Sequence, residues 1–359
     1  MINVTKTYLP SFDKYTSVLK KAWDKAWITN NGELLQELEH RLKEKLGSSH
    51  VYFCTNGTIV LQMALKALNI KKEVITTPFS YVATVDALLW EGCKPIFADI
   101  NEKNFCIDAD KIEELITPNT EAILATHVYG YPCDVDKIQA IAEKHNLKVI
   151  YDGAHAFGCR YKGKPLLSYG DISTCSFHAT KIFHTVEGGS ISTNDEEIAR
   201  KLFLFRQFGH VYDDYFSMGI NAKNSEFHAA MGLCVMDDFE DILSCRKRVD
   251  GLYNELLAGL PLVRPSLPDQ DDFEYNYSYY PVIFPNERHV LRVQQTLKDN
   301  GYGSRRYFYP SLNTLPFVAG ASCTVSEDIA SRVLCLPLFH DLSEADQSRI
   351  CDIVRKSFS

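Results

Sequence analysis

The stretch from Val51 to Thr77, VYFCTNGTIVLQMALKALNIKKEVITT, contains the alternation that decides the fold. Its first four residues are an apolar run, which predicts a strand that ends at the turn Thr55-Asn56-Gly57. Apolar residues then recur at helical spacing over 58–68, and the run 73–77 predicts a second strand, which Pro78 ends. A strand, a helix and another strand in this order predict a βαβ unit with parallel strands.

The same alternation continues along the chain from about residue 33 to residue 200. Further helices are expected over 81–90 and 134–145, and further strands over 94–99, 122–127, 149–152, 176–178 and 189–193. This order predicts an α/β fold with a mostly parallel central sheet and helices on both of its faces. Ligands of such sheets bind at the carboxyl ends of the strands, and the candidate site residues below follow strand ends.

The regular alternation of strands and helices ends before residue 240. A long helix is expected over 237–258, with Gly259 placed to end it, followed by a Pro-rich crossing and a Tyr-rich strand over 275–284. A helix over 289–300 and a final helix from Ser343 complete the chain. We therefore expect a large α/β domain over 1–240 and a smaller α+β domain over 241–359.

Composition excludes several classes of protein. The 359 residues carry a net charge of −8, which argues against a nucleic-acid binder with a broad basic face. The 11 cysteines include no CxxC pair, so their spacing indicates neither a zinc site nor a redox site. No targeting segment and no apolar run of membrane-spanning length is visible, so we expect a cytoplasmic protein with no membrane partner.

The segment Ser176–Lys181, SFHATK, is followed by Glu187-Gly188-Gly189. It places a lysine between two apolar, strand-like runs. A desolvated lysine has a lowered pKa, which an amine that forms an imine needs. The alternative is a Gly-rich turn with an incidental lysine, and the residues alone favour the two interpretations equally.

A second segment, residues 151–158 (YDGAHAFG), places Asp152 at the end of a strand and His155 three residues later. A carboxylate there could keep a cofactor pyridinium protonated. A metal site would need another His or acid at ligand spacing, and none follows, so we expect no metal. The remaining alternative is an Asp that caps a helix beside a core histidine.

Two further strand ends complete the set. Gly57 and Thr58 lie between a strand and a helix, where exposed N–H groups bind phosphate, although many βα turns have this sequence. Tyr81 follows another strand and could stack on a flat heterocycle, although aromatic residues there more often pack in the core. A phosphate site, a stacking ring, an acid for a ring nitrogen and an amine together indicate pyridoxal phosphate (PLP).

With these segments in place, the chain resembles the DegT/DnrJ/EryC1/StrS family of sugar aminotransferases over nearly its whole length. The resemblance runs from residues 27–32 (WITNNG) to Leu336-Pro337-Leu338 and is most specific at SFHATK with EGG and at YDGAHAFG. It implies the fold type I architecture of PLP enzymes and a homodimer whose active sites are shared between subunits.

The resemblance also implies roles for individual residues. Lys181 would form the Schiff base with PLP and move protons, and Asp152 would pair with the pyridine nitrogen. Catalytic and cofactor contacts are implied for Gly57, Thr58, Tyr81, Asp152, His155, Ser176, Lys181 and Asn221. Asn221 lies in the segment 219–224 expected to reach the phosphate from the other subunit, where Ala222 and Lys223 depart from the usual family pattern and Lys223 and Asn224 are weaker candidates.

The implied reaction is transfer of an amino group from L-glutamate to a nucleotide-linked keto sugar. The opening TNNG at 29–32 and the runs 76–90 and 127–138 are most similar to the branch that acts on dTDP-4-keto-6-deoxyglucose and gives dTDP-4-amino-4,6-dideoxyglucose, an amino sugar of the lipopolysaccharide O-antigen type. A 3-aminotransferase for a dTDP-3-keto sugar and a 4-aminotransferase for a UDP-linked sugar are the alternatives. Another PLP-fold enzyme, such as a dehydratase or lyase, and a PLP-fold regulator are the more distant ones.

Substrate contacts are expected on both sides of the lysine segment. Arg305 and Arg306 lie in a loop of the smaller domain, where two guanidinium groups suit the oxygens of a nucleotide diphosphate, or form a solvated basic turn. The residues expected to contact the substrate are Thr29, His178, Arg305, Arg306 and Tyr309.

Overall fold

The computed structural model describes residues 1–268, 271–318 and 320–358. Its centre is a seven-stranded sheet in the order β1-β9-β8-β5-β4-β2-β3. Strands β2, β3, β4, β5 and β8 run parallel, whereas β9 is antiparallel to both of its neighbours. The sheet strands are β1 (His50–Cys54), β2 (Glu73–Thr76), β3 (Lys94–Phe97), β4 (Thr120–Thr126), β5 (Lys148–Asp152), β8 (Ile172–Ser176) and β9 (Gly189–Thr193).

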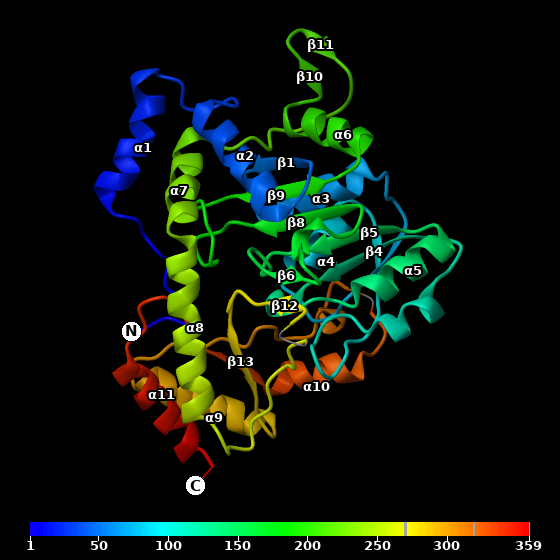
Figure 1. The fold of residues 1–359 in the computed structure, drawn as a ribbon. Helices are drawn as coiled ribbons and strands as arrows, with labels where there is room; N and C mark the ends of the chain where they lie inside the picture. The colour runs from blue at the N-terminus through cyan, green and yellow to red at the C-terminus, as the bar shows by residue number, and fades with distance from the viewer. Residues whose placement is uncertain (269–270, 319, 359) are drawn as a thin grey trace.

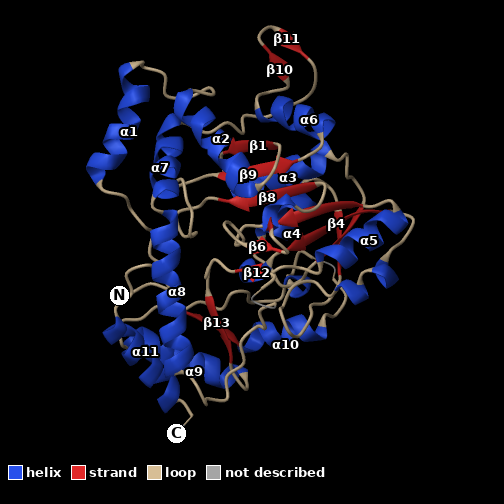
Figure 2. Cartoon of the chain, in the orientation of Figure 1, coloured by secondary structure: helices blue, strands red, loops and turns tan. Residues whose placement is uncertain are grey.

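Helices cover both faces of this sheet because alternate strand residues point to opposite sides. In β5, Val149 and Tyr151 pack in one apolar cluster and Ile150 packs in another. The first cluster is built with α2 (Glu33–Leu46), α5 (Val135–His145) and α7 (Glu226–Asp237), and the second with α3 (Gly57–Ala67), α4 (Ala83–Trp90) and α6 (Glu196–Arg206). The predicted mostly parallel sheet between two helix layers is confirmed, and Figure 2 shows the red strands between the blue helices.

The C-terminal part has its own apolar cluster. Side chains of α8 (Phe239–Leu256), α9 (Glu287–Asp299) and α11 (Glu344–Lys356) pack with the antiparallel pair β13 (Tyr280–Ile283) and β14 (Val333–Leu336). Helix α10 (Thr324–Arg332) packs instead against the first cluster of the large sheet. Figure 1 shows α8 following α7 down one side of the molecule, from the sheet to the C-terminal helices. The division at residue 240 therefore falls at the start of α8, and the two-domain partition stays a prediction.

Smaller elements flank this core. Helix α1 (Phe12–Asp24) lies against α7, and a short hairpin of β10 (His210–Val211) and β11 (Asp214–Tyr215) projects from the molecule (Figure 1). Three two-residue strands form a second small sheet in the order β12-β6-β7, from Phe273–Glu274, Arg160–Tyr161 and Lys164–Pro165. Within the described ranges, no helix is both long and apolar enough to cross a lipid bilayer.

The Tyr-rich segment differs from its prediction as one strand over 275–284. Only residues 280–283 are in β13, and Tyr277 has a positive φ of 53°. The side chains of Asn276 and Ser278 donate hydrogen bonds to the carbonyl of His155, at 2.7 and 2.8 Å. The segment leaves the strand conformation because these bonds tie it to the loop after β5.

Candidate active site

A pocket of about 310 Å³ lies at the carboxyl ends of β5 and β8. Asp152 is the last residue of β5 and Ser176 is the last residue of β8, and these two strands are parallel neighbours. The parallel pairing therefore brings both strand ends to the same edge. The expected residues that line the pocket are Gly57, Thr58, Tyr81, Asp152, His155, Ser176, His178, Lys181 and Arg305.

Lys181 lies in the turn that follows β8, where its backbone N–H donates to the carbonyl of His178 at 2.9 Å. Its Nζ donates to the hydroxyl of Tyr279 at 3.4 Å. Burial of the amine lowers the pKa of Lys181, and the nearby Asp152 carboxylate offsets part of this effect. A lowered pKa leaves more of the amine in its neutral, nucleophilic form.

Asp152 is buried, and both of its oxygens accept hydrogen bonds. Oδ1 accepts from the N–H of Ala154 at 3.0 Å, and Oδ2 accepts from the hydroxyl of Thr84 at 2.9 Å. Burial raises the pKa of Asp152, while these two bonds and the charge of Lys181 lower it. The Thr84 hydroxyl is itself 2.8 Å from that of Ser80, so the carboxylate is held by a buried chain of hydroxyl groups.

His155 is buried among aromatic rings. The backbone N–H of Tyr129 donates to its Nδ1 at 3.2 Å, so the neutral ring that this bond selects carries its proton on Nε2. Burial and the charge of Lys181 hold the pKa of His155 well below its usual value. The ring lies parallel to that of Phe308, with centroids 5.5 Å apart. His155 therefore offers the pocket a neutral N–H donor.

The turn before α3 forms a close cradle with β8. A Cβ atom on Gly57 would lie 2.8 Å from the Cβ of Ser176, so only glycine allows this approach. The side chain of Asn56 already accepts from the N–H groups of Thr58 and Ile59. Anion binding here would therefore use the N–H of Gly57 and the hydroxyl groups of Thr58 and Ser176 rather than the N–H of Thr58.

Tyr279, Tyr307 and Phe308 also line the pocket, and no sequence motif predicted them as site residues. All three come from the C-terminal part of the chain. The Tyr279 ring makes an edge-on contact with His155 at 4.9 Å, and burial raises the pKa of its hydroxyl, which therefore stays protonated. The Tyr-rich composition of 275–280 was the only available signal, and it does not specify which tyrosine faces the lysine.

The structure does not place all the expected substrate contacts in the pocket. The guanidinium of Arg306 donates to Glu287 at 2.7 Å and to the carbonyl of Ser331 at 2.9 Å, and the Tyr309 ring lies 3.5 Å from it. Arg306 and Tyr309 thus link this loop to α9 and α10, and only Arg305 of the arginine pair reaches the pocket. Thr29 and Asn221 are exposed outside the described pocket lining.

Asn224 and Lys223 also have partners away from the pocket. The Asn224 amide donates to the carbonyls of Cys54 and Glu187, and the ammonium of Lys223 lies 5.0 Å from the Phe208 ring centroid. Among the described residues, no group of three or more His, Cys, Asp or Glu side chains could hold a metal ion.

The side chains of the pocket fit PLP. An amine, an acid beside it and a neutral N–H donor come together with the Gly57 cradle and the exposed ring of Tyr81. In PLP, the amine suits the aldehyde, the acid suits the ring nitrogen and the N–H donor suits the phenolic oxygen. The cradle suits the phosphate, and the tyrosine ring suits the flat face of the cofactor. The fit rests on the donors and acceptors of the chain itself.

Comparisons with known proteins find aminotransferases. A sequence model described as the DegT/DnrJ/EryC1/StrS aminotransferase family matches residues 13–355. The chain is 41% identical over 354 residues to a dTDP-4-amino-4,6-dideoxy-D-glucose transaminase from Escherichia coli, covering 96% of this chain and 95% of that protein. It is 39% identical over 362 residues to a Shigella dysenteriae enzyme of the same name, covering 99% and 98%. A crystal structure of DesI in the presence of its TDP-sugar product has a TM-score of 0.92 at 32% identity, covering 99% of this chain and 92% of that chain.

Proposed function

The chain belongs to the DegT/DnrJ/EryC1/StrS aminotransferase family, and we propose from this premise that it transfers the amino group of L-glutamate to dTDP-4-keto-6-deoxyglucose. The product would be dTDP-4-amino-4,6-dideoxyglucose. The choice of sugar is supported by the 41% and 39% identity to two transaminases named for that product, over at least 96% of this chain. The choice of chemistry is supported by one observation, the convergence of Lys181, Asp152 and His155 on one pocket.

Aminotransferases of this family are PLP enzymes. When bound, the cofactor supplies an electron sink for the bond that breaks at the donor's Cα. We infer that the amine of Lys181 would hold the cofactor and, once the amino donor has displaced it, would carry the proton from the donor's Cα to C4′ of the cofactor. In the second half-reaction the same amine would carry a proton from C4′ to the sugar carbon that receives the amino group. The lowered pKa of this amine suits a group that acts as base and as acid near neutral pH.

The remaining residues hold the cofactor. Asp152 would keep the ring nitrogen protonated, and its two hydrogen bonds favour the ionised carboxylate that this requires. The Nε2–H of His155 would donate a hydrogen bond to the phenolic oxygen of the cofactor. Tyr81 would cover the ring, and Gly57, Thr58 and Ser176 would hold the phosphate.

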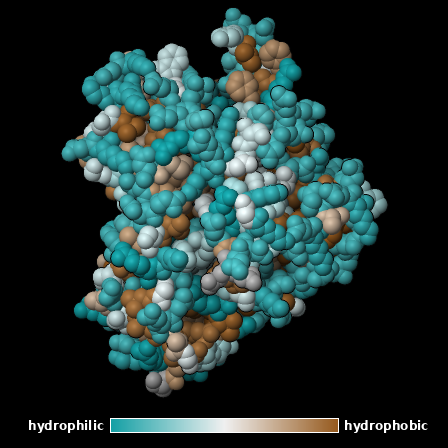
Figure 3. Space-filling view, viewed as in Figure 1, coloured by the Kyte–Doolittle hydropathy of each residue, from teal (hydrophilic) through white to brown (hydrophobic). Residues whose placement is uncertain are grey.

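We also propose a homodimer with shared active sites. The segment 208–220 projects from the molecule and exposes large apolar side chains, including Tyr212 at 91% and Met218 at 77%. Figure 3 shows brown apolar atoms on this projection. Exposed apolar surface of this kind marks a protein contact, and it adjoins Asn221, which would reach the phosphate of the partner subunit.

We propose that the reaction takes place in the cytoplasm. All 11 cysteines are unpaired thiols and ten of them are buried, as expected for a protein that folds in a reducing compartment.

The test begins with the visible absorption of the purified holoenzyme. We expect a PLP band that glutamate bleaches, and borohydride reduction should attach the cofactor to the peptide that contains Lys181. The Lys181→Ala variant is the control and should retain no covalent label. A label on another lysine, or no chromophore, would contradict the proposed chemistry. Comparing dTDP-4-keto-6-deoxyglucose with its 3-keto isomer and a UDP-linked 4-keto sugar, and locating the new amine by NMR, tests the substrate.

A further inference from the structure

The loop that carries Lys181 joins β8 to β9 over residues 177–188 and contains no helix or strand. We call it the lysine loop. Its two ends meet where the N–H of Phe177 donates to the carbonyl of Gly188 at 2.8 Å. After the lysine, the ring of Phe183 is fully buried and anchors the loop in the core. The residues just before the lysine are exposed or half-buried, so the direction of the amine depends on what holds them there.

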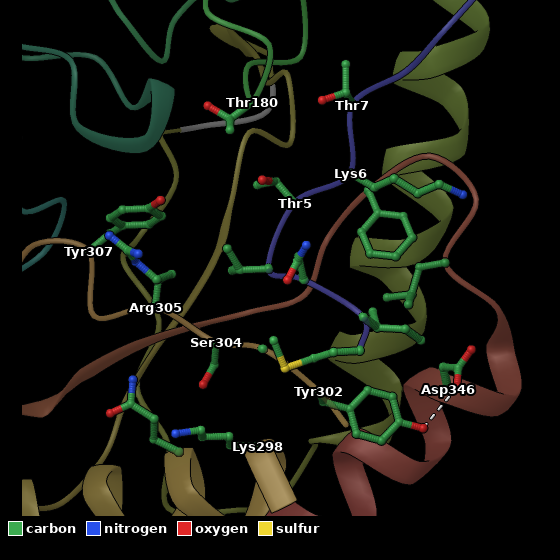
Figure 4. Close-up of a pocket in the computed structure, with 18 of the residues that line it drawn as sticks. Thr5, Lys6, Thr7, Thr180, Lys298, Tyr302, Ser304, Arg305, Tyr307 and Asp346 are labelled. Atoms are coloured by element: carbon green, nitrogen blue, oxygen red, sulfur yellow. Dashed lines mark hydrogen bonds between the residues drawn. The ribbon is translucent and has the colours of Figure 1, made fainter. Parts of the chain in front are cut away.

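Segment 1–8 of the chain holds the lysine loop just before the lysine. The hydroxyl of Thr7 donates to the carbonyl of Ala179 at 2.9 Å. Within the described ranges, no other hydrogen bond ties the backbone of 178–181 to a segment distant in the sequence. Figure 4 shows Thr7 and Thr180 at the same end of the space that segment 1–8 borders. The hydrogen-bonded link between this part of the loop and the rest of the fold is therefore one hydroxyl group.

His184 makes a second bond to the same segment, three residues after the lysine. The N–H of Val186 donates to its Nδ1 at 3.2 Å, so the neutral ring carries its proton on Nε2 and donates it to the carbonyl of Tyr8 at 2.7 Å. The ring is fully buried, and burial lowers the pKa of His184, which favours this neutral form. Val186 has a φ of 68°, which is costly for a β-branched residue, so His184 holds a strained position of the lysine loop.

Segment 1–8 is itself held by other elements. The carbonyl of Val4 accepts from the N–H of Leu338 at 3.0 Å, shortly after β14. The hydroxyl of Tyr8 donates to Asp238 at 2.9 Å, at the junction of α7 and α8. Burial raises the pKa of this hydroxyl to about 12, so it stays a donor. The segment therefore links the lysine loop to the C-terminal part of the chain and to the long helices beside it.

We propose that Thr7 and His184 are positioning residues for the amine of Lys181. This inference rests on the proposed function, which takes that amine as the group that reacts. Thr7 holds the loop before the lysine and His184 holds it after, so the amine stays directed into the pocket. Neither side chain lines the described part of that pocket, so both act through the loop and not by contact with the cofactor.

The first test replaces Thr7 in the holoenzyme. Thr7→Val removes the hydroxyl and keeps the shape of the side chain, so the glutamate half-reaction should slow about fivefold, the factor for one neutral hydrogen bond. Thr7→Ser keeps the hydroxyl and should retain the wild-type rate. The matched control is Thr5→Val on the same segment, because the Thr5 hydroxyl has no hydrogen-bond partner among the described residues. The control should also react at the wild-type rate.

Two further measurements separate positioning from a general structural role. Hydrogen exchange followed by mass spectrometry should show faster exchange in peptides of the lysine loop of Thr7→Val, and unchanged exchange elsewhere. In a Lys181→Ala background, Thr7→Val should leave the dissociation constant of PLP unchanged, because Asp152 and the Gly57 cradle are untouched. Faster exchange throughout the chain together with weaker PLP binding would overturn the inference, because Thr7 would then support the fold as a whole.

The second test replaces His184, so that the inference stays testable if Thr7→Val does not fold. His184→Asn can still accept from the N–H of Val186, but its amide is too short to reach Tyr8. This variant should also slow the glutamate half-reaction about fivefold. The longer amide of His184→Gln places an N–H donor near the position of Nε2 and should retain most of the rate. Equal losses in the two variants would contradict a role for the bond to Tyr8.

The possible failures are distinguishable. If the wild type shows a PLP band that glutamate bleaches, while Thr7→Val and His184→Asn match it in rate and in loop exchange, the positioning inference is wrong and the proposed function stands. If the wild type forms no such band, the proposed function is wrong and the inference falls with it. A slower half-reaction without faster exchange of the lysine loop would also overturn the inference, because the effect would not pass through the loop.

Discussion

At the scale of single residues, burial sets the protonation of the side chains around the pocket. His127 follows β4 directly, is fully buried, and accepts a hydrogen bond on Nδ1 from the N–H of Cys133 at 3.2 Å. Burial lowers the pKa of His127 from its usual 6.5 to about 3. The folded protein therefore holds a neutral ring at a pH where the unfolded chain would bind a proton.

This difference predicts a loss of stability in mild acid. The folded pKa of His127 lies below the unfolded one, so the unfolded state gains protons first as the pH falls below 6.5. At about 1.4 kcal/mol per pH unit, His127 should cost roughly 2 kcal/mol of unfolding free energy between pH 6.5 and pH 5. Urea unfolding at pH 6.5 and pH 5 measures the difference in unfolding free energy between the wild type and His127→Gln, and this difference should be smaller at pH 5 by that amount. The difference between the wild type and His127→Phe, which also cannot titrate, should decrease equally. If neither difference changes with pH, the prediction is wrong.

Tyr279 gives a second prediction at this scale. Its hydroxyl is the hydrogen-bond partner of the Lys181 amine, so Tyr279→Phe should leave that amine less well positioned. The loss of one such bond, worth about 1.4 kcal/mol, should lower kcat of the glutamate half-reaction roughly tenfold while the KM for the sugar nucleotide stays the same. Stopped-flow measurement of that half-reaction checks this.

The control for Tyr279 is its neighbour. Tyr280 donates to Asn254 at 2.8 Å, in the C-terminal cluster, so Tyr280→Phe removes a buried hydroxyl without touching the pocket. Equal effects of the two substitutions on kcat would mean that the hydroxyl of Tyr279 is only structural.

At the scale of elements, the start of α3 shows how a strand, a turn and a helix build one feature of the site. Asn56 caps the helix with its side chain, and Gly57 brings the turn against Ser176 at the end of β8. The cap fixes the position of the helix, and the glycine removes the Cβ that would separate the two elements. The cradle is thus a property of two elements in contact.

We expect Gly57→Ala to weaken cofactor binding at least tenfold, because the added Cβ would lie 2.8 Å from that of Ser176 and push the turn away. The PLP dissociation constant, followed by absorbance on reconstitution, measures this. The matched control is Gly251→Ala in α8, where, apart from the adjoining helix backbone, no atom of the described residues lies within 4 Å of the added Cβ. That variant should bind PLP normally and gain about 1 kcal/mol of stability from helix propensity. Normal PLP affinity in Gly57→Ala would rule out the cradle as the phosphate site.

At the scale of the whole molecule, the catalytic pocket combines residues from distant parts of the chain. The turn before α3, the ends of β5 and β8 and the loops near 279 and 305 line it together. The residue expected to complete the phosphate site, Asn221, is exposed outside the described pocket lining beside the projecting hairpin. This arrangement suits a dimer in which each subunit supplies Asn221 to the other.

Mixed dimers test this arrangement. Lys181→Ala and Asn221→Asp should each be nearly inactive alone. If Asn221 serves the partner's site, a mixed dimer has one intact site, and random reassociation of equal amounts should restore about a quarter of wild-type activity. Light scattering confirms that both variants remain dimers. No recovery after verified subunit exchange would show that Asn221 does not act across the interface.

The sequence by itself determined the alternation of strands and helices, and with it the positions of Asp152 and Gly57. It misplaced the strand expected over 176–178, because β8 spans Ile172–Ser176 and Ser176 is its last residue. Parallel strands bring their carboxyl ends to one edge whatever the rest of the fold does, so local periodicity was enough to group these residues. The same periodicity placed α9 and α11 within a few residues of their observed limits, 287–299 and 344–356. It failed at 275–279, because the bonds of Asn276 and Ser278 to a distant carbonyl overrode the strand pattern.

Only the tertiary structure decided which side chains complete the site. Tyr279 and Lys181 are 98 positions apart, and no local pattern relates them. Arg305 and Arg306 are neighbours of the same type, yet Arg306 pairs with Glu287 while Arg305 reaches the pocket. The direction of a loop side chain depends on the partners that the fold brings to it, whereas the face of a strand or helix follows from its repeat.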